Sequence, residues 1–257
     1  MIKISAFSRK QVSKRNEDAY GYDGKTFVVA DGVTDKSGER YNKKTGGEIA
    51  ANIVVKRCLA SSKNGRALVK ELNAEVKKVY KKLCPAALKD WRYRFAAVFC
   101  CARIVGKDLV MTQVGNVGFR VNGGKIYKED ELVSSITGHL RSFYIQKTGD
   151  IKGAREYMMP LLVEQFKLHN DPKHVLGFGV IEGLSTPAKF IKTYKFPLKN
   201  IKTLEIFTDG YYDVPKVSTV KAWEELHKQV NKLDPYKYKK YKSTKSEDDR
   251  TVMIVRF

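Results

Sequence analysis

Apolar residues alternate or run together in many short segments, whereas longer segments show the spacing of an amphipathic helix. Strands are predicted at 2–8, 26–30, 95–105, 108–115, 118–129, 174–183, 188–198, 202–210 and 251–257. Helices are predicted at 46–60, 65–83, 153–168 and 217–233. Because strands outnumber helices and most are joined by hairpin turns, the pattern predicts an α+β protein with antiparallel sheets covered by helices.

Two helix boundaries carry local signals of their own. Ser218 stands where a polar side chain would cap the helix at 217–233. Pro160 lies inside the helix predicted at 153–168, and we expect it to kink or end that helix, because proline lacks the backbone N–H.

The composition is that of a globular chain. It has 257 residues, of which 42% are hydrophobic, with no internal repeat and no low-complexity linker, so we expect a single domain over residues 1–257. No apolar run approaches the roughly 20 residues that span a bilayer. The sequence shows no secretory signal and no CxxC pair among its four cysteines, so we expect a cytoplasmic location and reduced thiols.

The net charge of +21 is large for this length. Such a charge predicts attraction to nucleic acid, acidic lipid headgroups or phosphorylated substrates. The densest basic run is KLDPYKYKKYKSTK at 232–245, where tyrosines alternate with lysines. Nucleic-acid binding would use the lysines for phosphate contacts and the tyrosines for stacking, but we favour a solvated basic loop.

Acidic residues stand at the ends of several apolar segments. Asp31 and Asp209 each follow an apolar run and precede a glycine, Asp248 precedes the final strand, and Glu17 and Asp18 lie just before the strand at 26–30. Carboxylates at the ends of buried strands are costly unless they are paired or bind a metal. Their recurrence in so basic a protein predicts one shared site, although a single Asp-Gly pair is also a common turn.

The chemistry of these side chains favours a hard cation. Oxygen ligands without a nearby histidine or cysteine suit Mg²⁺ or Mn²⁺. Two such ions held by shared carboxylates activate water for displacement at phosphorus. The glycines after Asp31 and Asp209 allow a sharp turn and a close backbone approach.

Six segments together resemble one known family. They are RNEDAY (15–20), VVADGVTD (28–35), GGEIAA (46–51), VGNVGFRV (114–121), IFTDGYYD (206–213) and DDRTVMIV (248–255). Their order and spacing resemble the PP2C-like (PPM) metal-dependent Ser/Thr protein phosphatases, across nearly the whole chain.

The resemblance implies a four-layer αββα sandwich of two antiparallel sheets flanked by helices. It also implies hydrolysis of phosphoserine and phosphothreonine by water that two Mn²⁺ or Mg²⁺ ions activate, without a phosphoenzyme. The resemblance assigns a role to each matching position. Asp31 bridges the two ions, Gly32 offers its carbonyl oxygen, and Asp209 and Asp248 complete the coordination of the first ion. Glu17 and Asp18 bind the ions directly or through water, and Asp213 belongs to a third, looser metal site.

The sequence departs from the family at one substrate-binding position and at one metal-binding position. Ser13 replaces the arginine that grips the substrate phosphate, so neighbouring Arg15 or Lys14 is expected to do so. Arg15 is preferred, because a guanidinium holds phosphate through two hydrogen bonds. Asn116 replaces an acid at the third metal site. Because a neutral amide is a weaker ligand for a hard cation, we expect two ions and a weakened third site.

The proton donor for the leaving group is left open by the sequence. Val33-Thr34-Asp35 stands where the family often has a histidine. Protonation then falls to water or to another group, for which His139 and His169 are candidates.

The main prediction is therefore a protein phosphatase that acts, as a monomer, on a phosphorylated protein substrate, for which the positive net charge favours an acidic sequence. A catalytically weak pseudophosphatase with a binding role is the first alternative, suggested by Ser13 and Asn116. A basic nucleic-acid-binding protein is the second. The complete set of Asp31, Asp209 and Asp248 favours an active enzyme.

Overall fold

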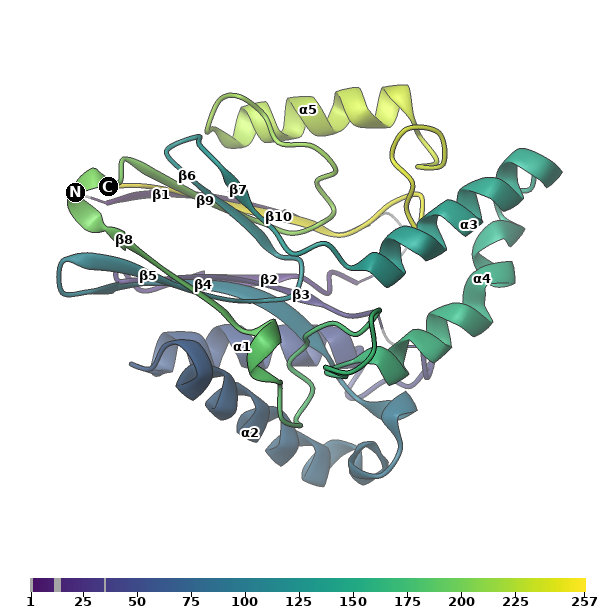
Figure 1. The fold of residues 1–257 in the computed structure, drawn as a ribbon, viewed down its shortest axis with the longest axis horizontal. Helices are drawn as coiled ribbons and strands as arrows, with labels where there is room; N and C mark the ends of the chain where they lie inside the picture. The colour runs from purple at the N-terminus through teal and green to yellow at the C-terminus, as the bar shows by residue number, and fades with distance from the viewer. Residues whose placement is uncertain (1, 12–14, 35) are drawn as a thin grey trace.

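The computed structural model describes residues 2–11, 15–34 and 36–257. Its strands form two five-stranded antiparallel sheets (Figure 1). In order across the first sheet these are β1 (Lys3–Arg9), β10 (Arg250–Arg256), β9 (Thr203–Phe207), β6 (Gly118–Val121) and β7 (Ile126–Tyr127). In order across the second sheet they are β2 (Ala19–Tyr22), β3 (Thr26–Gly32), β4 (Ala97–Val105), β5 (Asp108–Val114) and β8 (Lys192–Pro197).

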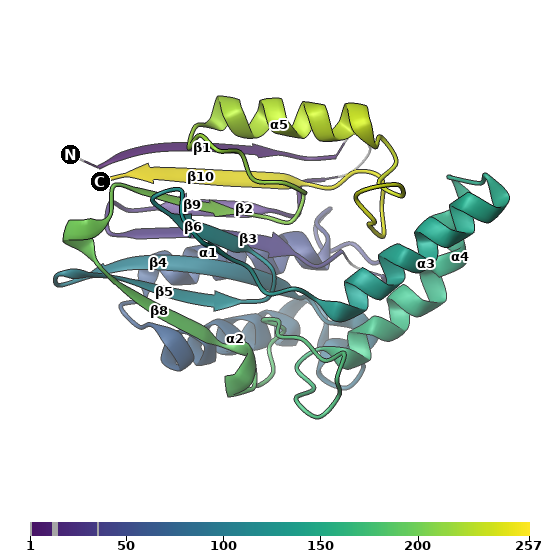
Figure 2. The same cartoon turned by 45° about the horizontal axis from the view of Figure 1, so that its top comes forward.

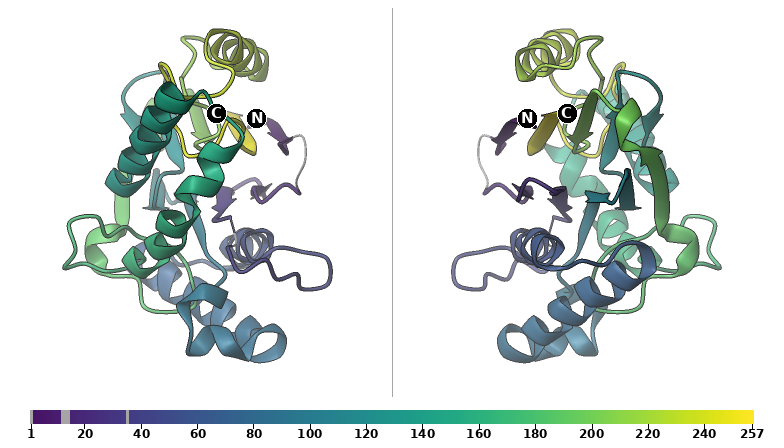
Figure 3. Two further views of the ribbon diagram at one scale, coloured as in Figure 1. Left: turned by 90° about the vertical axis from the view of Figure 1, so that its right-hand side faces the viewer. Right: turned by 90° about the vertical axis from the view of Figure 1, so that its left-hand side faces the viewer.

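Helices cover the outer faces of the two sheets. The helix α5 (Val220–Leu233) lies over the first sheet, and α1 (Gly46–Ala60) with α2 (Gly65–Leu83) lies over the second (Figure 2). End-on views show the resulting order of helix, sheet, sheet and helix (Figure 3). The predicted αββα sandwich is therefore confirmed.

The remaining helices lie at one end of the sandwich. There α3 (Leu132–Thr148) and α4 (Gly153–Glu164) form a helical pair beyond the strand ends of both sheets (Figure 1). Short 3₁₀ helices join other elements, at Pro85–Leu88, Trp91–Tyr93, Gln165–Leu168, Ala188–Phe190 and Leu198–Asn200. Within the described residues, no helix is both long and apolar enough to cross a bilayer.

Three apolar cores hold the layers together. One lies between α1, α2 and the second sheet, one between the two sheets, and one beneath α5. Cys100 and Cys101 are neighbours on β4, and strand alternation sends Cys100 into the core between the sheets and Cys101 into the core under the helices. All four cysteines are buried and free.

Several predicted elements agree closely with the structure, and α1 and α2 match their predicted ranges. The cap of α5 is Thr219 rather than Ser218, because the Thr219 side chain accepts a hydrogen bond from the Ala222 N–H. The α-helix α4 continues past Pro160 to Glu164, and Gln165–Leu168 follows as a 3₁₀ helix.

Residues 174–183 and α3 differ most from the prediction, while β2 has no predicted counterpart and the strand predicted at 118–129 divides into β6 and β7. Residues 174–183 form no strand and make only isolated bridges, with Phe178 facing His169 and Ile181 facing Ala97. The helix α3 was not anticipated. Its buried face includes Thr137 and Arg141, so the apolar spacing that identifies most helices is weak there.

Strand pairing gathers the acidic segments at one end of the sandwich. On the first sheet, Phe207 at the end of β9 pairs with Val252 near the start of β10, so the segments carrying Asp209 and Asp248 lie side by side. On the second sheet, Asp31 is the penultimate residue of β3.

Candidate metal centre

A cavity of about 540 Å³ opens at this end of the sandwich. Asp31, Asp209 and Asp248 line it together with Gly32 and Asn116. We call it the acidic cavity after the three aspartates. They come from three distant parts of the chain, so the structure brings together the residues that the sequence singled out.

The glycine that follows each of two aspartates is required by close backbone packing. A Cβ atom on Gly32 would lie 2.5 Å from the carbonyl of Gly47 at the start of α1. A Cβ atom on Gly210 would lie 1.9 Å from the carbonyl oxygen of Asp249. Both Asp-Gly pairs therefore mark places where backbones meet, rather than ordinary hairpin turns.

Glu17 and Asp18 are buried next to these segments. The backbone N–H of Glu17 donates to Asp249 Oδ2 at 2.7 Å, and the Thr208 hydroxyl donates to Asp18 Oδ2 at 2.9 Å. One carboxylate oxygen of each residue, Glu17 Oε1 and Asp18 Oδ1, is buried without a hydrogen-bond partner. Asp249 thus ties the start of β10 to the N-terminal segment.

Burial and mutual repulsion perturb the carboxyl groups. Burial raises the pKa of Asp31 well above its usual range, and the charges of Asp18, Asp209 and Asp248 raise it further. Burial likewise raises the pKa of Asp18, against hydrogen bonds from threonine hydroxyls that lower it. Burial raises the pKa of Asp248 to about 6, although Lys245 opposes this. A cluster of this kind is stabilised by cations.

Basic side chains also line the acidic cavity. Among them are Lys245, at the end of the basic run 232–245, and Arg155, and no sequence motif assigned either of them to the site. The Lys245 Nζ lies 2.5 Å from Asp248 Oδ1. Arg155, on α4, donates from Nη1 to the carbonyl oxygen of Thr244 at 2.8 Å. With 49 lysines and arginines in the chain, no local pattern distinguishes these two.

The donor chemistry fits a hard cation, although a complete metal site is not assembled. Carboxylates of the cavity lining supply oxygen donors, and Asn116 in the lining, with Glu17 and Asp18 nearby, each have a buried side-chain oxygen without a hydrogen-bond partner. Among the described residues, however, no three Asp, Glu, His or Cys side chains are grouped closely enough to hold a metal ion.

The two residues assigned to the third metal site lie apart. Asn116 donates from Nδ2 to Asp209 Oδ2 at 3.0 Å, at the cavity wall. Asp213 is exposed, is not part of the cavity lining, and accepts a hydrogen bond from the Tyr241 hydroxyl at 3.0 Å.

Of the two candidates for gripping phosphate, Lys14 lies outside the described residues. Arg15 is half-exposed and forms two hydrogen bonds with the Glu48 carboxylate, of 2.6 and 3.1 Å. It does not contribute to the lining of the acidic cavity. Arg15 thus has an acidic partner at the start of α1 and is not turned toward the three aspartates.

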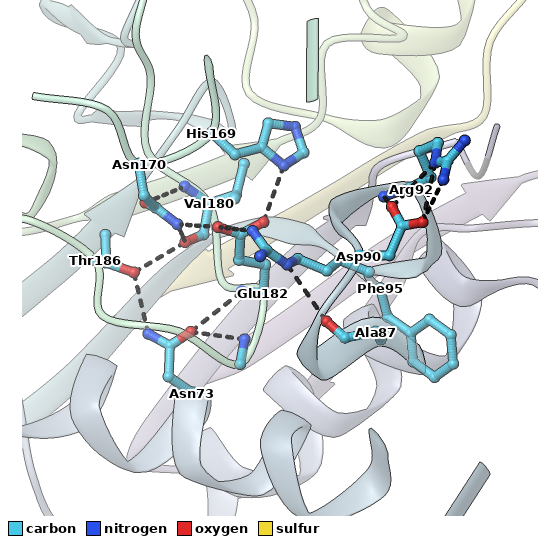
Figure 4. A network of polar contacts seen from close by, with 12 residues as sticks. Asn73, Ala87, Asp90, Arg92, Phe95, His169, Asn170, Val180, Glu182 and Thr186 are labelled. Atoms are coloured by element: carbon cyan, nitrogen blue, oxygen red, sulfur yellow. Dashed lines mark hydrogen bonds and ion pairs between the residues drawn. The ribbon is translucent and has the colours of Figure 1, made fainter. Parts of the chain in front are cut away.

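The two candidate histidines differ in their surroundings. His139 is exposed on α3, away from the cavity lining. His169 lines the cavity, and its ring lies between Phe166 and Phe178 with Nδ1 3.2 Å from Glu182 Oε2 (Figure 4).

Glu182 is held in turn by several groups. Asn170 donates to its Oε1 at 3.0 Å, and Asn73 Oδ1 accepts from its backbone N–H at 3.1 Å (Figure 4). This network gives His169 a fixed orientation at the wall of the cavity.

Glu131 is a further acidic group of the cavity that sequence reasoning missed. It directly precedes α3 and accepts a hydrogen bond from the Ser134 hydroxyl at 2.9 Å. Burial raises its pKa to about 7, with a further contribution from the charge of Asp209.

Comparison with solved structures identifies the same architecture elsewhere. No protein-family model and no curated protein matches the chain. A bacterial serine phosphatase superposes with a TM-score of 0.57 at 18% identity, covering 100% of this chain and 98% of that one. The Ser/Thr phosphatase Stp1 of Staphylococcus aureus gives 0.54 at 17%, covering 100% and 95%.

The catalytic domain of the Ser/Thr protein phosphatase PstP, solved in complex with two manganese ions, gives a TM-score of 0.55 at 13% identity. The match covers 99% of this chain and 97% of that one. The chain therefore has the fold of these phosphatases over its whole length.

Proposed function

We propose that this protein is a metal-dependent phosphatase that hydrolyses phosphoserine and phosphothreonine in proteins. One observation carries the proposal: Asp31, Asp209 and Asp248, from three separate segments, line one cavity at the end of a phosphatase-like sandwich. Buried carboxylates that repel one another are a costly arrangement, and cation binding is the function that makes use of it.

The residues proposed to hold two Mn²⁺ or Mg²⁺ ions are those of the acidic cavity and its neighbours. They are Asp31, Gly32 through its carbonyl, Asp209 and Asp248, with Glu17 and Asp18 directly or through water. Bound ions would lower the pKa of a water molecule and neutralise charge on the phosphoryl oxygens. The manganese-bound PstP domain, which shares the fold, supports the choice of ion.

The chain's own basic groups would orient the substrate. Lys128, Lys242 and Arg155 line the same cavity as the aspartates. Together with the net charge of +21, they favour an acidic phosphopeptide over a basic one.

The proposal is tested by hydrolysis of an aryl phosphate with and without Mn²⁺. We expect Mn²⁺-dependent turnover by the wild type, none in excess EDTA, and loss of turnover in Asp31→Asn. Asp23→Asn is the matched control, because Asp23 is an exposed turn residue whose Oδ1 acceptor the asparagine retains. Undiminished activity in Asp31→Asn, or in EDTA, would refute the proposal.

A catalytically weak phosphatase that acts mainly by binding phosphoproteins is the second candidate. The Lys245 ammonium among the acids and the amide of Asn116 favour it. Retention of a phosphopeptide without its hydrolysis in Mn²⁺ would distinguish this candidate from the first. Nucleic-acid binding through residues 232–245 gains no comparable support. Lys237 in that run is buried, and Lys242 and Lys245 line the acidic cavity, which leaves Lys232, Lys239 and Lys240 as exposed lysines away from the cavity.

A further inference from the structure

Lys245 lies within an otherwise acidic group of side chains. Its Nζ contacts Asp248 Oδ1 at 2.5 Å, and only 19% of the side chain is exposed. Its ammonium forms an ion pair with Asp248 and lines the same cavity as Asp31 and Asp209. Lys245 is thus a fixed positive charge beside the three aspartates proposed to bind metal.

The loop that carries Lys245 is built around a buried carboxylate. In the α5–β10 loop (residues 234–249), the two oxygens of Asp234 accept backbone N–H groups from Tyr238, Lys239, Lys240 and Tyr241. The buried Lys237 donates to the Asp234 carbonyl oxygen at 2.7 Å. The basic run that the sequence presents as a solvated loop is therefore an ordered turn.

Two arginines from the α3–α4 pair fix this loop at the cavity. Arg141, itself buried, donates to the carbonyl oxygens of Tyr236, Lys237 and Ser243 and to the Ser246 hydroxyl. Arg155 donates to the carbonyl oxygen of Thr244, the residue before Lys245. The residues on both sides of Lys245 are thus held, Thr244 through its backbone and Ser246 through its hydroxyl, so the fold places the Lys245 side chain in the acidic cavity.

We propose that Lys245 is a tethered counter-ion of the acidic cavity, and that a divalent cation must displace its ammonium from Asp248 in order to bind there. This inference rests on the proposed function, because it concerns the same carboxylates. It gives Asp31, Asp209 and Asp248, whose charges repel one another, a positive charge within the cavity that they share. The flexible lysine stem can swing out while the backbone stays in place.

The consequence is that Lys245 sets the affinity for metal. A positive charge a few ångströms from a cation site opposes binding, and removal of the charge leaves carboxylates that only a cation can neutralise. The protein would accordingly take up Mn²⁺ only at concentrations high enough to compete with Lys245.

The test is calorimetric titration of Mn²⁺ into the full chain. We expect Lys245→Met to bind Mn²⁺ about tenfold more tightly, or better, than the wild type. Lys245→Arg keeps the charge and should not show this gain. Lys239→Met is the matched control: it removes an exposed lysine of the same loop, and it should leave the affinity unchanged.

Thermal melting of the same variants guards against a folding artefact. In EDTA, Lys245→Met should melt at a lower temperature than Lys239→Met, and Mn²⁺ should recover the difference. Suppose that the wild type binds Mn²⁺ and hydrolyses an aryl phosphate, and that Lys245→Met binds Mn²⁺ equally or more weakly. This result would overturn the proposed counter-ion role of Lys245 and leave the proposed function intact. Tighter Mn²⁺ binding by Lys245→Met, together with a wild type that lacks phosphatase activity, would support the counter-ion role of Lys245 and refute the proposed function.

Discussion

The side-chain amide of Asn116 donates from Nδ2 to Asp209 Oδ2 across 3.0 Å, at the wall of the acidic cavity. The related phosphatase motif has an acid at this position, and an acid there would repel Asp209 instead of donating to it. Asn116 thus helps to stabilise the carboxylates, while its own Oδ1 is left without a partner.

Replacement of Asn116 by aspartate should turn this stabilising hydrogen bond into a repulsion between two carboxylates. In EDTA we expect Asn116→Asp to be less stable by about 1–2 kcal/mol, because a hydrogen bond is lost and a like charge is gained. In saturating Mn²⁺ the added carboxylate becomes a ligand, so the melting temperature should rise more than that of the wild type. Melting curves in EDTA and in Mn²⁺ measure both effects, and an equal Mn²⁺ response in the two proteins would contradict this account.

Glu131 should make the stability of the metal-free protein depend on pH. Its pKa is raised to about 7 from 4.5, so between these values the folded state keeps a proton that the unfolded state loses. The contribution of Glu131 to the free energy of unfolding is therefore fully present below pH 4.5 and is lost as the pH rises through 7. Glu131→Gln stays neutral, so it should gain stability relative to the wild type by up to about 3 kcal/mol between pH 4.5 and 8.

Urea unfolding at several pH values in EDTA measures the Glu131 effect. Glu156→Gln, an exposed glutamate on α4, serves as the control and should follow the wild-type pH profile. Parallel profiles for Glu131→Gln and the wild type would show that Glu131 does not titrate differently on folding.

Arg141 should hold the α5–β10 loop against α3. Arg141→Gln loses charged donors to three carbonyl oxygens and one hydroxyl, so we expect a loss of at least about 2 kcal/mol. Limited proteolysis with trypsin should then cut first at the exposed Lys239 and Lys240 of the loop. Lys147→Gln, at an exposed position of the same helix, should show wild-type cleavage within the loop. Wild-type cleavage of the loop in Arg141→Gln would contradict the role assigned to Arg141.

The layered fold and the gathering of Asp31, Asp209 and Asp248 could be predicted from the sequence. Strand patterns are local, and an acid placed at the end of an apolar strand is conspicuous in a basic chain. The helix α3 could not be predicted in this way, because its buried face includes Thr137 and Arg141. Residues 174–183 look like a strand, but side-chain hydrogen bonds such as Asn170 Nδ2 to the Val180 carbonyl hold them in irregular form.

The basic residues of the site could not be assigned to it from the sequence. Lys245 and Arg155 reach the acidic cavity only because a loop and a helix distant in sequence lie against it. In a chain with 49 basic residues, composition and spacing do not reveal which ones do so.

The most direct test of the central claim is phosphate release from an acidic phosphoserine peptide, measured with Mn²⁺ for the wild type and for Asp209→Asn. We predict steady release by the wild type, no release in EDTA, and a rate at least about 100-fold lower for Asp209→Asn, because a metal-activated water is lost. Equal rates for the two proteins, or release that persists in EDTA, would contradict the account.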